Sequence, residues 1–324
     1  MVWQDLRLQN IFRLSELHVY NKSMNTKFSK YIPKFDENCN KYSRGHVAIF
    51  AGSVEYPGAA VLCSKAAARS GVGYVELFTP EPLQKDIALK LESVVVRPLN
   101  VDENFNLDKS CIKNCVFKKL DSILIGPGFS TGKAQSKLLK HLLDVDAPLI
   151  IDADAITIFA TAISDNVTYK KIINHKKPII LTPHAGELKH LLAYASTDNI
   201  NNWTKDKLVN EVQTWIRKNN LYNVVVIAKG PDTTVICNDA YNTCTLGTST
   251  LATAGTGDVL AGCVASFMAQ ARPQSTAESL NVCSAAVETH GLAGEISALT
   301  FGKHGVMAGD VADALGVAID TLVI

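Results

Sequence analysis

The chain has 324 residues, of which 47% are hydrophobic and 19% are charged, and its formal net charge is +1 at pH 7. This length suits one large α/β domain or two small ones. The near balance of 32 basic and 31 acidic residues excludes the broad positive field that drives binding to nucleic acids or anionic membranes. No apolar run approaches the roughly 18 residues of a membrane span, so we expect neither a nucleic-acid partner nor a membrane.

The N-terminal segment and the cysteines point to a reducing compartment. The first thirty residues lack the apolar core and small-residue cleavage site of a secretory signal. The stretch LRLQNIFRL, with Arg7 and Arg13, is interpreted as an N-terminal helix, with an organelle transit peptide as the alternative. Eight cysteines are spread along the chain, and the close pair Cys111 and Cys115 does not have the spacing of a zinc knuckle or redox pair. We predict reduced, mostly buried thiols and a cytoplasmic location.

From residue 45 onward, short apolar runs alternate with segments of helical length. The runs predict strands at 46–52, 73–79, 122–128, 148–154, 178–184 and 223–230, followed by a hairpin at 233–247. The segments between them predict helices at 58–71, 133–145, 186–195 and 205–220, and we expect a chiefly helical chain from Asp258 onward. Continuous apolar runs suit strands buried on both faces. The alternation therefore predicts one α/β domain, with helices on both sides of a mostly parallel sheet.

The residues that end each apolar run are the expected ligand site, because ligands in such folds bind beyond the carboxyl ends of the strands. Asp152 and Asp154 are two residues apart, so we expect them to point the same way and to contact solvent or a metal. Buried carboxylates that cap neighbouring loops are an equally good interpretation. Lys229 follows a strongly apolar strand, so its charge must be satisfied near the sheet end, by a phosphate or by reaching solvent.

The stretch ATAGTGD, residues 252–258, places a carboxylate within small residues and glycines. Gly255 and Gly257 are expected to adopt positive φ, and Asp258 is expected to open a helix, so that backbone amides converge on one anion-binding spot. A carboxylate beside a bound phosphate could take the proton of a hydroxyl that attacks this phosphate. A plain N-cap aspartate is the competing interpretation, but a cap does not require so much glycine.

The stretch LTPHAGE places His184 at a strand end and Glu187 in the first helical turn after it. His184 could hydrogen-bond a ligand and Glu187 could bind Mg²⁺ through water, while a helix cap and a favourable helix charge are the equal alternative. Other nucleotide and hydrolase motifs do not fit. GPGFSTGKA fails the P-loop pattern, GSVEYPG is not G-x-G-x-x-G, and no G-x-S-x-G occurs.

Seven ordered motifs resemble those of the ADP-dependent NAD(P)H-hydrate dehydratases, members of the ribokinase-like superfamily. They are RGHVAIFAGSVEYPGAAVLCSKAAARSGVGYV, IGPGFS, IDADAI, LTPHAGE, VIAKGPDTTVI, LATAGTGDVLAG, and HGLAGE followed by GVMAGDV. The resemblance implies a ribokinase-like three-layer α/β/α domain at 31–324, after an N-terminal extension at 1–30. It also implies a lyase that repairs nicotinamide cofactors, by ADP-dependent dehydration of the S-epimer of hydrated NADH or NADPH (NADHX, NADPHX) with release of AMP and phosphate.

The same resemblance assigns residues and partners. It implies that Asp258 is the catalytic base and that Glu187 is a candidate Mg²⁺ ligand. It also implies that ADP is the phosphoryl donor, with ATP as the alternative, and that the chain forms a homotetramer. The residues that would contact the hydrate are Ala59, Gly128, Ser130, His184, Glu187 and Asp258. The residues that would bind the nucleotide are Lys229, Gly230, Pro231, Asp232, Thr233, Gly255, Thr256 and Gly257.

Some positions depart from the family pattern. Ala185 stands where proline is usual, and Ser130 stands where the family's GPGLG ends in glycine, which would narrow the loop near the substrate. About thirty residues precede the matched region, too few for the epimerase domain that many relatives carry. Two alternatives remain open. A sugar or vitamin kinase of the same superfamily would release a phosphorylated product, and a regulatory nucleotide-binding module would have lost catalysis, although an intact Asp258 argues against the latter.

Overall fold

The computed structural model describes residues 26–103, 107–108, 119–193 and 200–323. The N-terminal helix expected around Arg7 and Arg13 and the pair Cys111 and Cys115 lie outside the described residues. The other six cysteines are unpaired, and five of them are buried, which confirms the prediction of reduced thiols for this part of the chain. Within the described residues, no helix is both long enough and apolar enough to cross a membrane. The division into an extension at 1–30 and a domain at 31–324 stays a prediction.

Nine strands of the described residues form one sheet, in the order β3-β2-β1-β4-β5-β6-β7-β8-β9. The strands are β1 (His46–Phe50), β2 (Tyr74–Pro80), β3 (Val95–Leu99), β4 (Ser122–Ile125), β5 (Leu149–Ile151), β6 (Ile179–Leu181), β7 (Val224–Ala228), β8 (Thr234–Ile236) and β9 (Tyr241–Thr243). Neighbouring strands from β3 to β7 are parallel. The pairs β7/β8 and β8/β9 are antiparallel, as the predicted hairpin requires.

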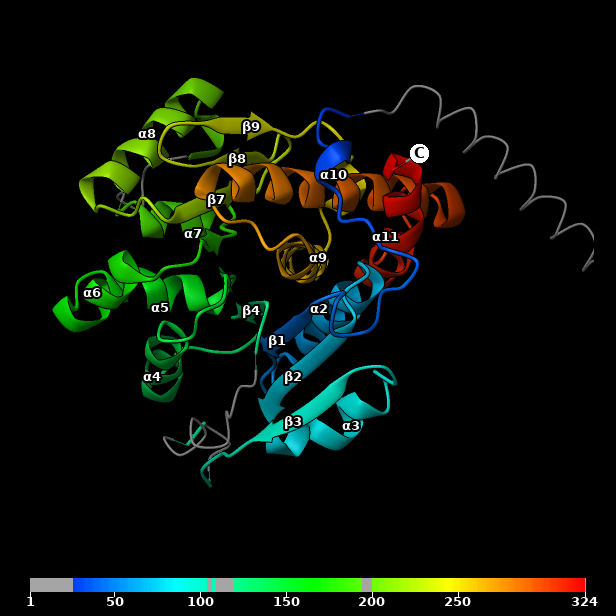
Figure 1. Cartoon of the computed structure of the whole chain (residues 1–324), viewed down its shortest axis with the longest axis horizontal. Helices are drawn as coiled ribbons and strands as arrows, with labels where there is room; N and C mark the ends of the chain where they lie inside the picture. The colour runs from blue at the N-terminus through cyan, green and yellow to red at the C-terminus, as the bar shows by residue number, and fades with distance from the viewer. Residues whose placement is uncertain (1–25, 104–106, 109–118, 194–199, 324) are drawn as a thin grey trace, which may run out of the picture.

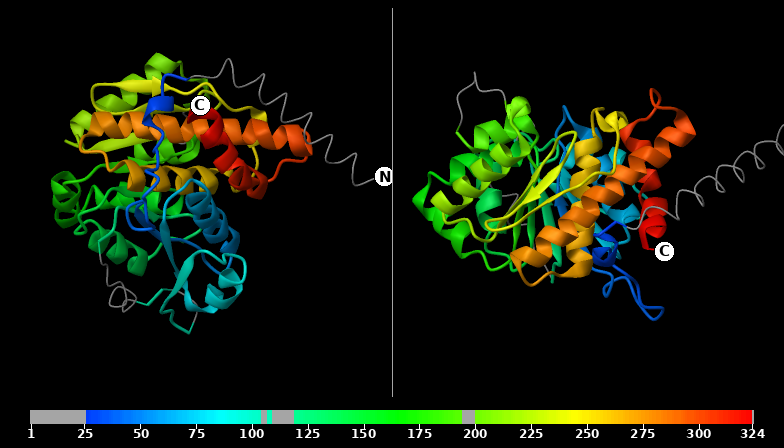
Figure 2. Two further views of the ribbon diagram at one scale, coloured as in Figure 1. Left: turned by 45° about the vertical axis from the view of Figure 1, so that its right-hand side comes forward. Right: turned by 90° about the horizontal axis from the view of Figure 1, so that it is seen from above.

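Helices cover both faces of the sheet (Figures 1 and 2). They are α2 (Pro57–Arg69), α3 (Gln84–Ala88), α4 (Lys133–Leu142), α5 (Asp154–Ala162), α6 (Asn166–Asn174), α7 (Ala185–Leu191), α8 (Lys205–Lys218), α9 (Thr256–Ala271), α10 (Thr276–Phe301) and α11 (Ala308–Val323). Short 3-10 turns occur at Ser29–Tyr31, Glu81–Leu83, Ile200–Asn202 and Ser249–Leu251. In Figure 2, helices α4 to α8 lie on one side of the sheet, and α2, α9, α10 and α11 lie on the other. This is the predicted three-layer α/β/α arrangement.

Two apolar cores follow from the alternation of side chains along each buried strand. In β1, Val47 and Ile49 belong to the core under α2, α9, α10 and α11, whereas Ala48 and Phe50 belong to the core under α4 to α8. All five β1 residues are buried, which explains why the strand appears in the sequence as a continuous apolar run.

The elements that the apolar pattern did not predict have local physical reasons. β3 lies at the edge of the sheet and contains Pro98 and the exposed Arg97, so it lacks a continuous apolar run; proline is tolerated there because an edge strand has an unpaired side. The strand predicted at 148–154 is too long at its carboxyl end, because Asp152 and Ala153 follow the strand and Asp154 is already the first residue of α5. β5 in fact ends at Ile151.

The order of strands reverses its direction at β1, because β2 and β3 lie on one side of it and β4 on the other. Loops after β1 and β4 therefore leave the sheet in different directions, and such a switch point is where open α/β sheets bind ligands. The two loops meet at the sheet edge, where the Gly52 N–H donates to the Pro127 carbonyl at 2.9 Å. The fold thus places the AGS and GPG stretches beside the expected site.

Candidate functional site

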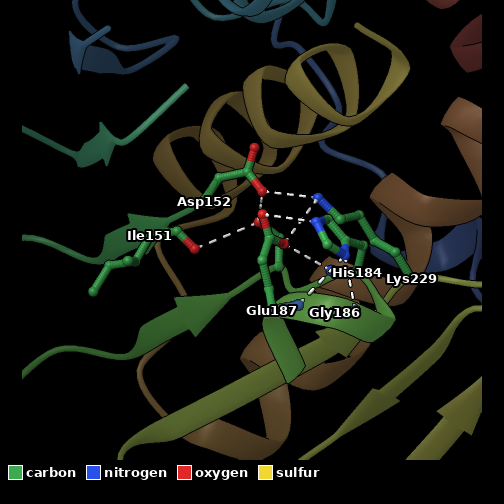
Figure 3. Close-up of polar contacts among 7 residues, drawn as sticks. Ile151, Asp152, His184, Gly186, Glu187 and Lys229 are labelled. Carbon is green, nitrogen blue, oxygen red and sulfur yellow. Dashed lines mark hydrogen bonds and ion pairs between the residues drawn. The ribbon is translucent and has the colours of Figure 1, made fainter. Parts of the chain in front are cut away.

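A charged cluster joins the carboxyl ends of β5, β6 and β7. Lys229 follows β7, and its Nζ lies 2.9 Å from Asp152 Oδ1 and 4.0 Å from Glu187 Oε2 (Figure 3). Asp152 follows β5, is 1% exposed, and also accepts a hydrogen bond of 2.5 Å from the Thr182 hydroxyl. The prediction that the Lys229 charge must be satisfied at the sheet end is confirmed, and carboxylates satisfy it in this structure.

His184 and Glu187 close the first turn of α7. His184 Nδ1 accepts from the Gly186 N–H at 2.9 Å, and the Glu187 carboxylate accepts from the His184 N–H at 2.8 Å, which forms a capping box. Since Nδ1 is an acceptor here, the proton of a neutral ring is on Nε2, which lies 3.3 Å from Glu187 Oε1. The helix-cap interpretation of His184 and Glu187 is therefore confirmed. The His184 side chain is 61% exposed, so its ring is also accessible to a ligand.

The helix α9 begins at Thr256, two residues before the predicted Asp258, and Asp258 lies in its first turn. Gly255 is the N-cap with φ +91°, a left-handed conformation that glycine adopts without strain. Gly257, in contrast, is helical, so the expected positive φ at this residue was wrong. A Cβ at position 257 would lie 3.3 Å from Lys229 Nζ. Glycine is suited to this position because it admits the ammonium group against the first turn of α9.

This contact combines two sources of positive potential. The first-turn N–H groups of a helix lack intrahelical partners and carry the positive end of the helix dipole. Lys229 adds an ammonium group at the same place. Burial alone would lower the pKa of Lys229, but its ion pairs with Asp152 and Glu187 outweigh burial and raise it. The group therefore stays charged, and together with the first-turn N–H groups of α9 it gives this place the positive potential that attracts anions.

The pKa of Asp258 is raised to about 7, chiefly by burial and next by the nearby carboxylate of Asp152, while Lys229 acts in the opposite direction. Burial is also the main cause that raises the pKa of Glu187. Three carboxyl groups, those of Asp152, Glu187 and Asp258, thus share the ammonium of Lys229. A carboxyl with a pKa near neutral pH can both accept and release a proton, which is the property a general base needs.

Three of the six residues predicted to contact the substrate, Ala59, Gly128 and Ser130, lie near the switch point between β1 and β4. A Cβ at Gly128, whose φ is +56°, would lie 2.9 Å from Ala59 Cβ and 2.7 Å from Tyr56 Cβ. Ser130 has φ 61°, a conformation that favours glycine, so the structure is compatible with the glycine expected here from the family pattern GPGLG. Its N–H donates to Asp154 Oδ2 at 2.7 Å, so Ser130 is tied to the start of α5.

The two aspartates of DADAI do not share one direction. Ala153 between them has φ 48°, and Asp154 is the first residue of α5 and not the end of a strand. Asp152 pairs with Lys229, whereas Asp154 caps the loop at Ser130. Of the two interpretations of this motif, loop capping is confirmed for Asp154, and the expected common direction was wrong.

A cavity of about 580 Å³ opens beside Lys229 and the start of α9. Six of the residues predicted to bind nucleotide line it, namely Lys229, Gly230, Pro231, Thr233, Thr256 and Gly257. Asp232 is exposed in the turn after β7, and Gly255 acts as the N-cap of α9. The cavity size suits a small organic ligand.

The rest of the cavity wall was not predicted from the sequence. It comes from the segment after β9 through Leu246, Gly247, Thr248, Ser249, Leu251 and Ala252, from α9 through Leu260, and from α10 through Val287, His290 and Gly291. A Cβ at Gly291 would lie 2.3 Å from the Leu246 carbonyl oxygen, so the helix and the segment pack backbone to backbone. The glycine in HGLAGE was a possible signal of such a close approach.

The residues fit Mg²⁺ as a companion of a bound nucleotide. Among the described residues, no group of three or more His, Cys, Asp or Glu side chains forms a ready metal cage. Mg²⁺ usually keeps several waters and binds through one or two carboxylates together with substrate phosphates. Glu187 and Asp152 offer carboxylate oxygens of this kind beside the place where phosphates are expected.

Comparison with known proteins identifies a family over most of the chain. A family model described as NAD(P)H-hydrate dehydratase matches residues 47–316. A bifunctional NAD(P)H-hydrate repair enzyme of Salinibacter ruber is 31% identical over 291 residues, which cover 87% of this chain and 49% of the relative. The chain thus spans about half the length of the bifunctional relatives that it matches. An ATP-dependent (S)-NAD(P)H-hydrate dehydratase of Batrachochytrium dendrobatidis is 26% identical over 91% of this chain and 96% of its own length.

A similar fold is found in a crystal structure of an ADP/ATP-dependent NAD(P)H-hydrate dehydratase from Bacillus subtilis, co-crystallized with ATP and Mg²⁺. The TM-score is 0.71 and the identity 23%, over 90% of this chain and 94% of the other. At this identity the likeness concerns the fold, and it confirms the ribokinase-like architecture.

Proposed function

The chain belongs to the NAD(P)H-hydrate dehydratase family, and from this premise we propose that it dehydrates the S-epimer of hydrated NADH or NADPH and so restores the reduced cofactor. ADP, or ATP in its place, would supply the phosphoryl group that converts the ring hydroxyl into a leaving group. The chain would thus act as a lyase in nicotinamide cofactor repair. The names of the relatives support the substrate class.

The observation that carries the proposal is the position and protonation of Asp258. Its carboxyl lies in the first turn of α9, its pKa is raised to about 7, and Lys229 approaches the same turn. A phosphate bound at this helix start would lie near a group that can take a proton. This is the arrangement that phosphoryl transfer to a hydroxyl needs, because positioning and charge stabilisation supply most of its catalysis.

In the proposed reaction, the ring hydroxyl of the hydrate attacks the terminal phosphoryl group of the nucleotide, and Asp258 takes the hydroxyl proton. The bond from phosphorus to the bridging oxygen breaks, and AMP leaves when ADP is the donor. The ring nitrogen then pushes electrons toward the phosphorylated carbon, the carbon–oxygen bond breaks, and phosphate leaves as a proton is lost to solvent from the adjacent carbon. Lys229 and the first-turn N–H groups of α9 would hold the phosphates in line.

Mg²⁺ would enter with the nucleotide and would neutralise phosphate charge. Glu187 would hold it through water, with Asp152 as the second carboxylate nearby. Near the hydrate, Ala59, Gly128 and Ser130 would form the narrow wall at the switch point. His184 would offer its ring to the substrate from the start of α7.

To test the proposal, the purified chain is mixed with Mg²⁺ and hydrated NADH, and ADP or ATP is added in separate reactions. The quantity measured is the near-ultraviolet absorbance of the reduced nicotinamide ring. We expect a nucleotide-dependent rise, and the faster donor names the preference. Asp258→Asn is the matched control, because it keeps the size of the side chain and removes the base; it should abolish the rise while nucleotide binding persists. A flat trace with verified hydrate would contradict the proposal and favour a kinase of small alcohols.

We also propose that the chain acts as a homo-oligomer, a tetramer as the resemblance implies, in the cytoplasm. Light scattering during size-exclusion chromatography measures the assembly directly. A monomer at working concentration would contradict the oligomer proposal and would leave the reaction proposal intact.

A further inference from the structure

Part of the cavity wall is apolar. It is formed by Leu246 and Leu251 from the segment after β9, Leu260 from α9 and Val287 from α10. The phosphate end of the cavity is defined by Lys229 and the start of α9. An apolar wall beyond a phosphate site suits the base and sugar of a nucleotide, which offer flat apolar faces and a few hydrogen-bonding groups.

His290 of α10 lines the same cavity and has no role in the phosphate site. Its side chain is largely buried, with 7% of the residue exposed, and Nε2 finds no hydrogen-bond partner among the described residues. Buried polar atoms in native structures nearly always have a partner. An exception in a cavity wall therefore points to a missing ligand group or a water.

The chemistry of the ring defines what this partner must be. Burial lowers the pKa of His290 to about 4, so the ring is neutral at neutral pH, and a hydrogen bond with the Thr256 backbone acts in the opposite direction. An interaction that favours the protonated ring must involve the Thr256 carbonyl as acceptor. Since Nε2 is unpartnered, Nδ1 is the donor, and Nε2 of the neutral ring is left as an acceptor.

A phosphate cannot satisfy such an atom, because a phosphate oxygen is itself an acceptor. The sugar and the base of a nucleotide carry O–H and N–H groups that can. We propose that His290 is a nucleoside-binding residue, whose Nε2 accepts a hydrogen bond from a hydroxyl of the sugar or an amino group of the base. The inference rests on the proposed function for placing a nucleotide in this cavity. It assigns a positioning contact to the histidine of the HGLAGE motif, which has no part in the phosphate site.

The position of His290 shows how this contact could help to align the nucleotide. The ring is linked to the backbone of Thr256, the first residue of α9, and the same turn carries Asp258 and meets Lys229. A hydrogen bond from the nucleoside to His290 would therefore fix the position of the nucleoside relative to the first turn of α9, where the phosphates are expected to bind. This would align the terminal phosphoryl group with the base Asp258.

The test measures binding by titration calorimetry with Mg²⁺ and without hydrate, so that turnover plays no part. His290→Asn places an amide nitrogen near the position of Nδ1 and removes Nε2, whereas His290→Gln reaches toward the position of Nε2 and is the matched control. We expect His290→Asn to weaken ADP binding about 5- to 20-fold, to leave tripolyphosphate binding unchanged, and His290→Gln to recover part of the loss.

Two ADP analogues identify the donor group. Wild type should bind 2′-deoxy-ADP more weakly than ADP if the sugar supplies the donor, and inosine diphosphate more weakly if the base amine supplies it. The variant His290→Asn should no longer distinguish that analogue from ADP. In nitrogen NMR of the histidine rings, the Nε2 signal of His290 should shift with ADP and not with tripolyphosphate.

The inference would be overturned if His290→Asn bound ADP as tightly as wild type, or if it lost ADP and tripolyphosphate to the same extent, which would indicate damage to the whole cavity. Failure of the proposed reaction is a separate outcome. A wild-type chain that binds ADP in a His290-dependent way and does not restore NADH would contradict the repair activity and would support this inference. A wild-type chain that binds neither ADP nor ATP would overturn both.

Discussion

At the scale of single residues, the site depends on an excess of carboxyl groups over ammonium groups. Asp152, Glu187 and Asp258 surround Lys229, and burial together with mutual repulsion raises the pKa of the two latter acids. The shift at Asp258 brings its titration close to neutral pH, where a base is most effective. Buried like charges are costly, and Mg²⁺ would add positive charge that balances the excess of carboxylates.

The first prediction concerns the pH dependence of turnover. A base must be deprotonated to act, and the pKa of Asp258 in the fold is about 7. We therefore expect kcat/KM to fall as pH decreases through about 7 and to reach a plateau above it. Glu187→Gln should move this midpoint to lower pH, because it removes a negative charge that raises the pKa of Asp258. Profiles measured with both forms check this, and a flat wild-type profile between pH 5 and 8 would contradict the assignment of Asp258.

The second prediction concerns the ion pair of Lys229 with Asp152. Lys229→Met leaves the nearly fully buried Asp152 carboxylate without its partner, so we expect a loss of about 3 kcal/mol in the free energy of unfolding. Nucleotide binding should weaken in the same variant. Denaturant unfolding of Lys229→Met, Asp152→Asn and the double variant forms a cycle. The double variant should be more stable than the sum of the single losses implies, and additive losses would show that the pair is not coupled.

At the scale of elements, α9 decides where Asp258 lies, and close packing against α2 fixes α9. A Cβ at Gly262 would lie 2.1 Å from the Cys63 carbonyl oxygen, so the two helices meet backbone to backbone at this point. Cys263, next to Gly262 in the sequence, is buried as well. The position of Asp258 therefore depends on a contact about one turn further along α9, where there is no room for a side chain.

The third prediction follows from this contact. Gly262→Ala should lower the free energy of unfolding by about 1–3 kcal/mol, because the added methyl group must push the helices apart. It should also reduce kcat, since a small displacement of Asp258 disturbs the alignment with the phosphate. Gly309→Ala is the matched control: it is also helical, its Cβ meets nothing within 4 Å, and it should leave kcat unchanged. Equal behaviour of the two variants would contradict this account.

At the scale of the whole molecule, one sheet gathers groups that are far apart in the sequence. They follow strands that run parallel in this sheet: Ala59 in the helix after β1, Gly128 after β4, His184 after β6 and Lys229 after β7. The carboxyl ends of these strands therefore share one edge of the sheet. Helix α9, which packs in the core shared with α2, α10 and α11, supplies Asp258. A ligand that contacts both the loops after these strands and the start of α9 would hold the two together and stabilise the fold.

The fourth prediction uses this linkage. A nucleotide that binds the folded chain and not the unfolded one should stabilise it by about 2.7 kcal/mol at a hundredfold excess over Kd. We expect a rise in Tm with increasing ADP and Mg²⁺ in calorimetric scans. Lys229→Met should need more ADP for the same rise. An identical dependence on ADP concentration in wild type and Lys229→Met would show that the nucleotide binds elsewhere.

Much of the fold was determined by the sequence on its own, for a physical reason. A strand buried on both faces must be apolar at every position, so β1, β4, β6 and β7 stand out as continuous runs that end in glycine, proline or a charged residue. The edge strand β3 is only half buried and lacks that signal. Likewise, the glycines beside Asp258 predict a turn. A glycine can be required there because its φ is positive, as at Gly255, or because another group packs closely against it, as Lys229 does at Gly257. The sequence does not distinguish these two reasons.

The site divides in the same way. Motif order was sufficient for the family and for Asp258, Lys229, His184 and Glu187 as candidate residues, because these groups follow strands or begin helices and are read locally. Tertiary structure alone decided that Lys229 pairs with Asp152, that the pKa of Asp258 rises to about 7, and that α10 brings His290 to the cavity wall. Burial and electrostatic coupling are sums over neighbours that are distant in the chain, so no local pattern contains them.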